Sequence, residues 1–225
     1  MTLREDLAAF KANFEAGGPP YHAPDWIHEP MRRATAELVA SGAADKALKA
    51  GDRAPAFVLR DADGEEVASE ALLARGLLVV SFYRGAWCPY CNIDLRALEA
   101  ILPEYRALGA GLVAISPQTA ANSRRSAREN GLSFPILSDP GNAVAAAFGV
   151  RFALPDYLVA LYRDTFKNDL AVVNGEASWT LPMPSRFVIC PHGVILHAEV
   201  GPDYTQRPEP ADLLPVLRKA ASMAA

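Results

Sequence analysis

The feature that most constrains the fold is an apolar stretch over residues 77–83 that runs, through a short loop, into a Cys-x-x-Cys segment and an amphipathic stretch over 88–107. A short continuous apolar run is typical of a buried strand, whereas apolar residues three and four positions apart are typical of a helix. Pro89 fits the first position of that helix, because the N–H that proline lacks would have no partner there. The sequence therefore predicts a strand that turns into a helix, with Cys88 at the turn and Cys91 in the first helical turn.

These positions predict that the two cysteines form a redox-active dithiol. Residues three apart share one helical face, so the two sulfurs are near enough for a disulfide. The amino-terminal end of a helix favours negative charge and the thiolate is the reactive form of cysteine, so Cys88 is the expected nucleophile. The alternative is half of a zinc site, which would need two more ligands. Cys190 and the four histidines do not have the usual spacing of a second half, so we expect no metal and no cofactor.

From Gly51 onward, short apolar runs alternate with helical patterns, which predicts strand–helix–strand units around a mostly parallel sheet. The predicted strands are 56–60, 77–83, 111–116, 135–137, 186–190 and 194–199, and the predicted helices are 69–75, 88–107, 119–130, 141–148 and 209–222. Residues 149–185, here called the excursion, have no long period. A stretch of this length is either a functional loop or has short structure of its own.

The first fifty residues differ in texture and form a predicted helical arm. Helical spacing over 3–15 ends at a Gly-Gly-Pro-Pro run, and a second helix follows near 30–48, with a break expected at Ser41-Gly42. The arm contains no recognisable catalytic group, so we interpret it as a lid or a dimer contact. The expected organisation is an arm over 1–50 and an α/β domain over 51–225.

Charge and cysteine usage exclude several classes of function. The chain has 225 residues, with 22 Lys and Arg against 26 Asp and Glu, a net charge of −4, which argues against nucleic acid or an anionic membrane as partner. Its apolar runs are far shorter than the roughly 20 residues of a membrane span. The amino terminus lacks the pattern of a secretory signal, and three cysteines are too few for a secreted disulfide framework, so we expect a cytoplasmic protein.

Several segments resemble the alkyl hydroperoxide reductase and thiol-specific antioxidant (AhpC/TSA) family, the peroxiredoxins. The similar segments are GDRAPAFVL at 51–59, FYRGAWCPYC at 82–91, LVAIS at 112–116, LSFPILSDP at 132–140 and FGV at 148–150. The resemblance covers about residues 51–223. The arm and the Asp-Tyr-Thr segment at 203–205 further resemble the peroxiredoxin-like subgroup with a Cys-x-x-Cys site.

The resemblance implies a thioredoxin-like α/β fold, a central mixed sheet flanked by helices, with the arm as an amino-terminal helical extension. It also implies an antioxidant oxidoreductase, a thiol-dependent peroxidase acting on hydrogen peroxide or alkyl hydroperoxides. In such an enzyme the Cys88 thiolate attacks the O–O bond and becomes a sulfenic acid, which Cys91 captures as an intramolecular disulfide. A thioredoxin- or glutaredoxin-type donor would then restore the dithiol. A homodimer is the expected oligomer.

The sequence also departs from the family pattern. Typical peroxiredoxins carry Thr or Ser three residues before the peroxidatic cysteine and Pro seven residues before it, where this chain has Gly85 and Ser81. The hydroxyl that would orient peroxide is therefore absent. The position of the family's active-site arginine holds Pro184, and Arg186 is displaced in register, so the alternation along a strand can direct it elsewhere.

These departures favour a second function, protein thiol–disulfide exchange. Pro184 resembles the cis-proline that lies against the dithiol of thioredoxins. The pair Trp87-Cys88 is similar to thioredoxin, and Cys88-Pro89-Tyr90-Cys91 is similar to glutaredoxin. A third hypothesis is a non-enzymatic role, either a redox sensor or a metal-binding scaffold, in which the dithiol reports oxidation to a partner through the arm.

Other residues keep two interpretations at this stage. Arg84 either adds positive charge beside Cys88 or is structural, and Trp87 either shades the sulfur or fills the edge of the core. Ser116, at the carboxyl end of a strand, either faces the site or caps the next helix. Cys190 lies about 20 Å along an extended strand from Pro184, which favours a plain buried thiol over a second resolving cysteine.

Overall fold

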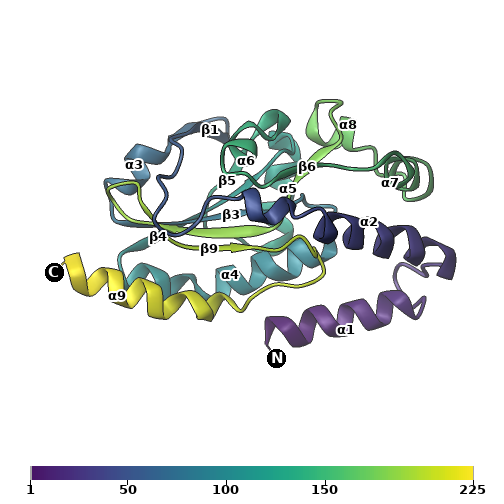
Figure 1. Ribbon diagram of the computed structural model, residues 1–225, viewed down its shortest axis with the longest axis horizontal. Coiled ribbons are helices and arrows are strands. Elements are labelled where there is room, and N and C mark those ends of the chain that lie inside the picture. The colour runs from purple at the N-terminus through teal and green to yellow at the C-terminus, as the bar shows by residue number, and fades with distance from the viewer. Residues whose placement is uncertain (1, 225) are drawn as a thin grey trace.

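Seven strands form a central mixed sheet in the computed structural model, which describes residues 2–224 (Figure 1). The strand order is β2-β1-β5-β4-β3-β8-β9. The strands are β1 (Val58–Asp61), β2 (Glu66–Ala68), β3 (Leu77–Phe82), β4 (Ala110–Ser116), β5 (Ile136–Ser138), β8 (Ser185–Ile189) and β9 (Ile195–Val200). Two of the six pairings, β3 with β4 and β4 with β5, are parallel, and the other four are antiparallel. The sheet is therefore mixed, and the prediction of a mostly parallel sheet is wrong.

The reason lies in the connections. Parallel neighbours need a long crossover, and the units containing α4 (Pro89–Ala107) and α5 (Ala120–Asn130) supply it for β3–β4 and β4–β5. The ends of the sheet are hairpins, β1–β2 and β8–β9, which pair antiparallel. β2 has three residues and was missed from the sequence.

Helices cover both faces of the sheet (Figure 1). One face packs on α4 and α9 (Leu214–Ala224), and the other on α3 (Ser69–Leu73) and α6 (Ala143–Ala147). All six residues of β3 are buried, with Val79 in the first of these cores and Val80 in the second. Burial on both faces explains why β3 is a continuous apolar run without alternation.

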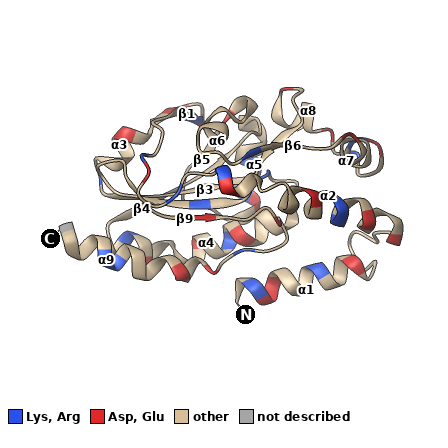
Figure 2. Cartoon of the chain, viewed as in Figure 1, with Lys and Arg blue, Asp and Glu red and all other residues tan. Residues whose placement is uncertain are grey.

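The arm contains two helices, α1 (Leu3–Glu15) and α2 (His28–Ala40). The break predicted at Ser41-Gly42 is confirmed: α2 ends at Ala40, and Gly42 adopts a positive φ of 65° before a 3-10 turn. Charges of both signs alternate along α1 and α2 (Figure 2). The backbone N–H groups of Leu3 and Arg4 donate to the Glu209 carboxylate, which ties the start of α1 to the far end of the chain.

The excursion has short structure of its own. It contains β6 (Arg151–Ala153), α7 (Asp156–Ala160), a π-helical turn (Leu161–Thr165), α8 (Leu170–Asn174) and β7 (Thr180–Pro182), with β6 and β7 paired as a small antiparallel sheet. The arm and the excursion share an apolar cluster in which Ile27 of the arm packs with Leu158 and Leu161 of the excursion. Two segments far apart in sequence thus form one layer beside the end of β3.

Candidate active site

The end of β3, a loop and the first turn of α4 place Cys88 as the sequence predicts. Cys88 is the N-cap of α4, Pro89 occupies its first position, and the Cys88 N–H donates to the Gly85 carbonyl at 3.1 Å. Both thiols are free. Both are buried, with exposed fractions of 1% for Cys88 and 0% for Cys91, and of the two only Cys88 lines the pocket described below.

The loop that carries Cys88 is clamped at Ala86 from two sides. The Ala86 N–H donates to Gln118 Oε1 at 2.8 Å, and Asn92 Nδ2 donates to the Ala86 carbonyl at 2.8 Å. Gln118 is itself fixed, because its Nε2 donates to the Tyr83 hydroxyl at 2.7 Å. Sequence reasoning missed Gln118, although the rule about strand ends that selected Ser116 points to the same loop. Ser116 is buried, and the N-cap of α5 is Thr119, so the helix-cap interpretation of Ser116 is wrong.

Gly85 has a conformation that other residues rarely adopt. Its φ is +145°, and a Cβ there would lie 2.5 Å from Trp87 Nε1 and 3.3 Å from Gln118 Oε1. The indole of Trp87 therefore folds back over the glycine. This packing leaves no room for the threonine or serine that peroxiredoxins usually carry at the position.

We expect Gly85→Ala to destabilise the protein by about 1–3 kcal/mol, because the strained backbone and the crowded Cβ both oppose folding. The matched control is Gly64→Ala, since Gly64 also has a positive φ but no atom would lie within 4 Å of its Cβ. Denaturant unfolding measures both losses, and alkylation of Cys88 reports the loop. Equal losses of stability in the two variants would contradict a role for the Trp87 contact.

The same loop carries a positive charge, Arg84, which is buried among aromatic rings. Its Nη2 donates to the Tyr162 hydroxyl at 2.5 Å. Its guanidinium carbon lies 4.0 Å from the ring centroid of Tyr204 and 4.8 Å from that of Trp87, within the range of cation–π attraction. The excursion supplies Tyr162, and the segment after β9 supplies Tyr204. Arg84 and Trp87 thus belong to one packed group next to Cys88.

Burial and the neighbouring charges shift the pKa values of the two thiols in opposite directions. Burial alone would raise the pKa of Cys88, but hydrogen bonding from Cys91 and the positive charges of Arg84 and Arg207 lower it below its usual value. Burial raises the pKa of Cys91, and the hydrogen bond to Cys88 and the negative charge on that sulfur raise it further. The thiolate is therefore favoured at Cys88 and the protonated thiol at Cys91, which is the order of acidity that a nucleophile at Cys88 would need.

A pocket of about 350 Å³ leads to Cys88, and its walls are largely aromatic. The arm contributes Phe10, Phe14, Tyr21 and Met31, the excursion contributes Tyr162 and Phe166, and Trp87, Tyr90 and Tyr204 complete the ring. Phe10 meets Tyr90, inside the Cys-x-x-Cys segment, edge to face with centroids 4.8 Å apart. The arm is therefore a wall of the site, in keeping with the lid interpretation.

The AhpC/TSA family profile matches residues 50–198, about two thirds of the chain. The chain belongs to the AhpC/TSA family. Peroxiredoxin Bcp of Escherichia coli is 36% identical over 103 residues, which cover 46% of this chain and 65% of that protein. The thiol-disulfide oxidoreductase ResA of Halalkalibacterium halodurans is 34% identical over 110 residues, 48% of this chain and 61% of that one. The chain thus spans about three fifths of the length of these relatives.

Solved structures show the same fold. The crystal structure of peroxidoxin BcpB from Mycobacterium tuberculosis has a TM-score of 0.60 and 24% identity, covering 76% of this chain and 97% of that one. Peroxiredoxin Q of Xanthomonas campestris has a TM-score of 0.56 and 20% identity, covering 73% and 91%. The α/β thioredoxin-like fold implied by the resemblance is confirmed.

The structure corrects the thioredoxin comparison at Pro184. Within residues 2–224 the single cis peptide bond joins Pro19 to Pro20, so the bond before Pro184 is trans. Arg186, two residues on, is buried at the start of β8 and forms an ion pair with Asp94 of α4. It therefore points to a carboxylate in this member of the AhpC/TSA family.

Cys190 lies far from the dithiol. β8 pairs antiparallel with β3, so Ile189 stands opposite Leu78 at the start of β3, whereas Cys88 follows the end of β3. Cys190 is partly exposed, and the expectation of a buried thiol is wrong in that respect. Over residues 2–224, no three His, Cys, Asp or Glu side chains converge as metal ligands would. In the same range, no helix has both the length and the apolar character that crossing a membrane requires.

Proposed function

We propose that the protein is a thiol-dependent peroxidase that reduces hydroperoxides through Cys88 and Cys91. The observation that carries this proposal is that the two sulfurs differ in pKa and in access to the pocket. Cys88, with its lowered pKa, lines the aromatic pocket, and Cys91, with its raised pKa, is fully buried behind it. A small peroxide can approach the Cys88 sulfur through the pocket. The Cys91 thiol stays protonated until Cys88 has been oxidised. Membership of the AhpC/TSA family supports the same reaction.

The proposed reaction has two steps. The Cys88 thiolate attacks one peroxide oxygen, the O–O bond breaks, and the leaving alkoxide takes a proton to become an alcohol, or water when the substrate is hydrogen peroxide. Cys88 is then a sulfenic acid. Cys91 loses its proton and attacks the Cys88 sulfur, so that a disulfide forms and the S–O bond breaks, and hydroxide leaves with that proton as water. Two thiols are oxidised for each peroxide reduced.

Arg84 is proposed to replace the Thr or Ser hydroxyl that orients peroxide in typical peroxiredoxins and that Gly85 lacks. A fast peroxidase needs donors aimed at the charge that develops on the leaving oxygen. The buried Nε–H of Arg84 has no acceptor among residues 2–224, and Arg84 lines the same pocket as Cys88. Its fixed charge also favours the thiolate that begins the reaction. One side chain thus serves both the nucleophile and the leaving group.

The pocket favours organic hydroperoxides over hydrogen peroxide. Its volume of about 350 Å³ accommodates a substrate much larger than hydrogen peroxide, and its walls are aromatic. Burying the apolar body of a substrate against such walls contributes roughly 25 cal/mol per Å² of apolar area. We therefore propose that an aryl or alkyl hydroperoxide has a higher kcat/KM than hydrogen peroxide.

Protein thiol–disulfide exchange is the second candidate. The Cys-x-x-Cys spacing and the similarity to ResA favour it. The 1% exposure of Cys88 opposes it while the arm is in place, because the disulfide of a folded partner protein cannot then reach the Cys88 sulfur behind Phe10, Phe14 and Tyr162. A peroxide small enough for the pocket meets no such obstacle.

We further propose a thioredoxin- or glutaredoxin-type reductant, a cytoplasmic location and a homodimer. The family supports the choice of reductant, and the reducing cytoplasm would keep all three thiols free between cycles. Sedimentation of the reduced and oxidised protein tests the dimer. The same comparison tests the redox-sensor hypothesis, which requires a large change in oligomeric state on oxidation with negligible turnover.

The deciding experiment is mass spectrometry of the reduced protein after an equimolar amount of cumene hydroperoxide or hydrogen peroxide. The expected product is a peptide pair linked through Cys88 and Cys91, with Cys190 still reduced. Steady-state peroxide consumption with thioredoxin gives the substrate preference, and insulin reduction tests the second candidate. An unlinked Cys88, together with insulin reduction faster than the dithiothreitol blank, would overturn the proposal.

A further inference from the structure

Arg207, in the segment after β9, reaches the second sulfur of the dithiol. Its exposed fraction is 6%, and its Nη2 donates to Cys91 Sγ at 3.6 Å. Its Nη1 donates to the carbonyl oxygens of Tyr204 and Gln206 at 2.8 and 2.7 Å. The guanidinium is therefore fixed by the backbone of its own segment and directed at Cys91.

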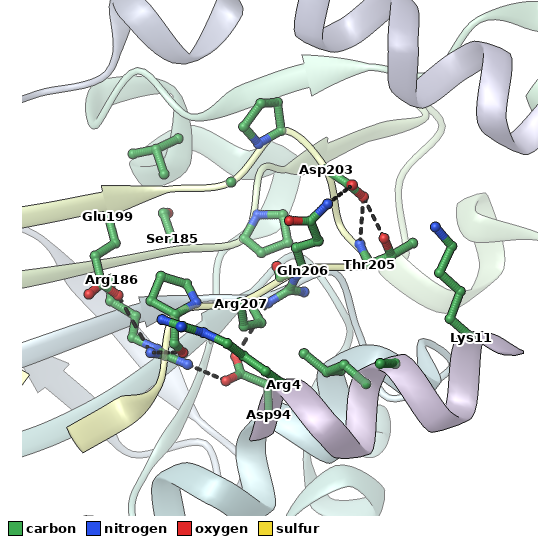
Figure 3. A pocket seen from close by; sticks show the side chains of 17 residues that line it. Arg4, Lys11, Asp94, Ser185, Arg186, Glu199, Asp203, Thr205, Gln206 and Arg207 are labelled. Atoms are coloured by element: carbon green, nitrogen blue, oxygen red, sulfur yellow. Dashed lines mark hydrogen bonds and ion pairs between the residues drawn. The ribbon is translucent and has the colours of Figure 1, made fainter. Parts of the chain in front are cut away.

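A buried carboxylate holds Arg207 from the opposite side. Asp94 lies one turn after Cys91 on α4, and its Oδ2 is 3.5 Å from Arg207 Nε. The same carboxylate forms an ion pair with Arg186, which also donates to the Pro208 carbonyl at 3.0 Å. Figure 3 shows dashed contacts from Asp94 to both arginines, in a pocket that Arg4 of α1 also lines. Buried charges of this kind are retained in proteins only when they are paired, and this set leaves one face of Arg207 for sulfur.

The proposed peroxidase reaction needs a cation at this place. Cys91 must lose its proton before it can attack the Cys88 sulfenic acid. In the reduced protein the negative charge of Cys88 opposes that loss. Oxidation removes this charge from the Cys88 sulfur, while the charge and the N–H groups of Arg207 stay where they are. The preferred site of negative charge then moves from Cys88 to Cys91.

We propose that Arg207 is a catalytic residue of the second step, in which it stabilises the Cys91 thiolate that forms the disulfide. The inference rests on the proposed function and adds a division of labour between two arginines. Arg84 serves Cys88 and the peroxide, and Arg207 serves Cys91. In the step itself, the Cys91 proton leaves with the Cys88 hydroxyl as water, the S–S bond forms, and Arg207 remains protonated throughout.

Other groups also face Cys91 and bear on its titration. They are Cys88 and Arg84 from the loop and the start of α4, Tyr83 from the end of β3 and Tyr162 from the excursion. Burial raises the pKa of both tyrosines, so they are neutral near neutral pH. Arg84 and Arg207 are therefore the cations of this group, and Arg207 is the one that donates a hydrogen bond to the Cys91 sulfur.

The first test needs no peroxide. In a Cys88→Ser/Cys190→Ser background, thiolate absorbance against pH measures the pKa of Cys91 alone. Adding Arg207→Met should raise that pKa by about one unit or more, because a charge-assisted hydrogen bond to the thiolate is lost. Arg207→Lys keeps the charge and should recover part of the shift. Arg186→Met is the matched control, since it disturbs the same charge cluster without touching sulfur, and it should change the pKa much less.

The second test separates the two chemical steps. After rapid mixing with cumene hydroperoxide, dimedone labelling measures the Cys88 sulfenic acid and quenched mass spectrometry measures the disulfide. Arg207→Met should slow disulfide formation about tenfold or more, with a smaller effect on Cys88 oxidation, so that sulfenic acid accumulates. The pH at half-maximal disulfide formation should move upward.

The outcomes distinguish this inference from the proposed function. An unchanged Cys91 pKa in both Arg207 variants, or equal slowing of both steps, would overturn the role of Arg207. So would an Arg186→Met effect as large as that of Arg207→Met, because it would reveal general disruption of the cluster. A different result would overturn the peroxidase and leave the coupling of Arg207 to Cys91 standing. In that result, Arg207→Met raises the Cys91 pKa in the first test, but Cys88 of the wild-type protein does not react with peroxide.

Discussion

Cys88→Ser is expected to abolish peroxide consumption, and Cys91→Ser is expected to permit a single turnover that ends as a stable sulfenic acid. A serine hydroxyl stays protonated near neutral pH and does not attack the O–O bond, so the first loss should be about a thousandfold or more. Cys91→Ser retains the nucleophile, and its expected defect lies in disulfide formation. Peroxide consumption with thioredoxin, together with dimedone labelling, separates the two effects.

Cys190→Ser is the control, because Cys190 lies at the opposite end of β3 from the dithiol. It should leave both steps unchanged. Full turnover in Cys91→Ser would show that another thiol resolves the sulfenic acid. Loss of turnover in Cys190→Ser would show that the remote thiol takes part.

Arg84→Met should give the second largest loss, and the pH profile should reveal its cause. The charge of Arg84 contributes to a Cys88 pKa lowered to about 6. Since the thiolate is the reactive form, wild-type oxidation should rise with pH through this value and level off above it. Without Arg84 the midpoint should move upward. The plateau should also fall, by about a hundredfold, because the leaving oxygen loses its donor.

Arg84→Lys provides the comparison. It keeps a charge beside Cys88 and loses the Nε–H donor, so its midpoint should lie closer to that of the wild type while its plateau remains low. Rapid oxidation by cumene hydroperoxide across a pH series measures both quantities, and circular dichroism checks folding after loss of the Tyr162 hydrogen bond. A midpoint that does not move in Arg84→Met would show that other groups ionise Cys88.

The central unit of the fold could be predicted because its signals are local. The apolar run of β3, Pro89 at the first helical position and the spacing of the cysteines each act within a few residues. The sheet direction could not be predicted in the same way. Whether β8 pairs parallel or antiparallel with β3 depends on how the excursion returns the chain, and nothing in the sequence of β8 records that route.

The supporting residues of the site escaped prediction for a related reason. Arg207 lies 116 residues from the cysteine that it contacts, and Gln118 lies 32 residues from Ala86. Asp94 offered a signal, a carboxylate one turn from Cys91 on a helical face otherwise filled by Leu95 and Leu98. Buried carboxylates are rare without a partner, so such a residue indicates a cation that arrives from elsewhere in the chain.

The position of the arm has a consequence for the two halves of the proposed catalytic cycle, peroxide reduction and recycling of the dithiol. In the proposed peroxidase, a peroxide would reach Cys88 past Phe10 and Phe14, whereas a protein donor as large as thioredoxin would reach the dithiol only after α1 moves away. The rate of peroxide reduction and the rate of recycling would then depend on different parts of the chain. Substitutions that weaken the docking of the start of α1 on Glu209, and keep Phe10 and Phe14, should change the recycling rate more than the rate of peroxide reduction.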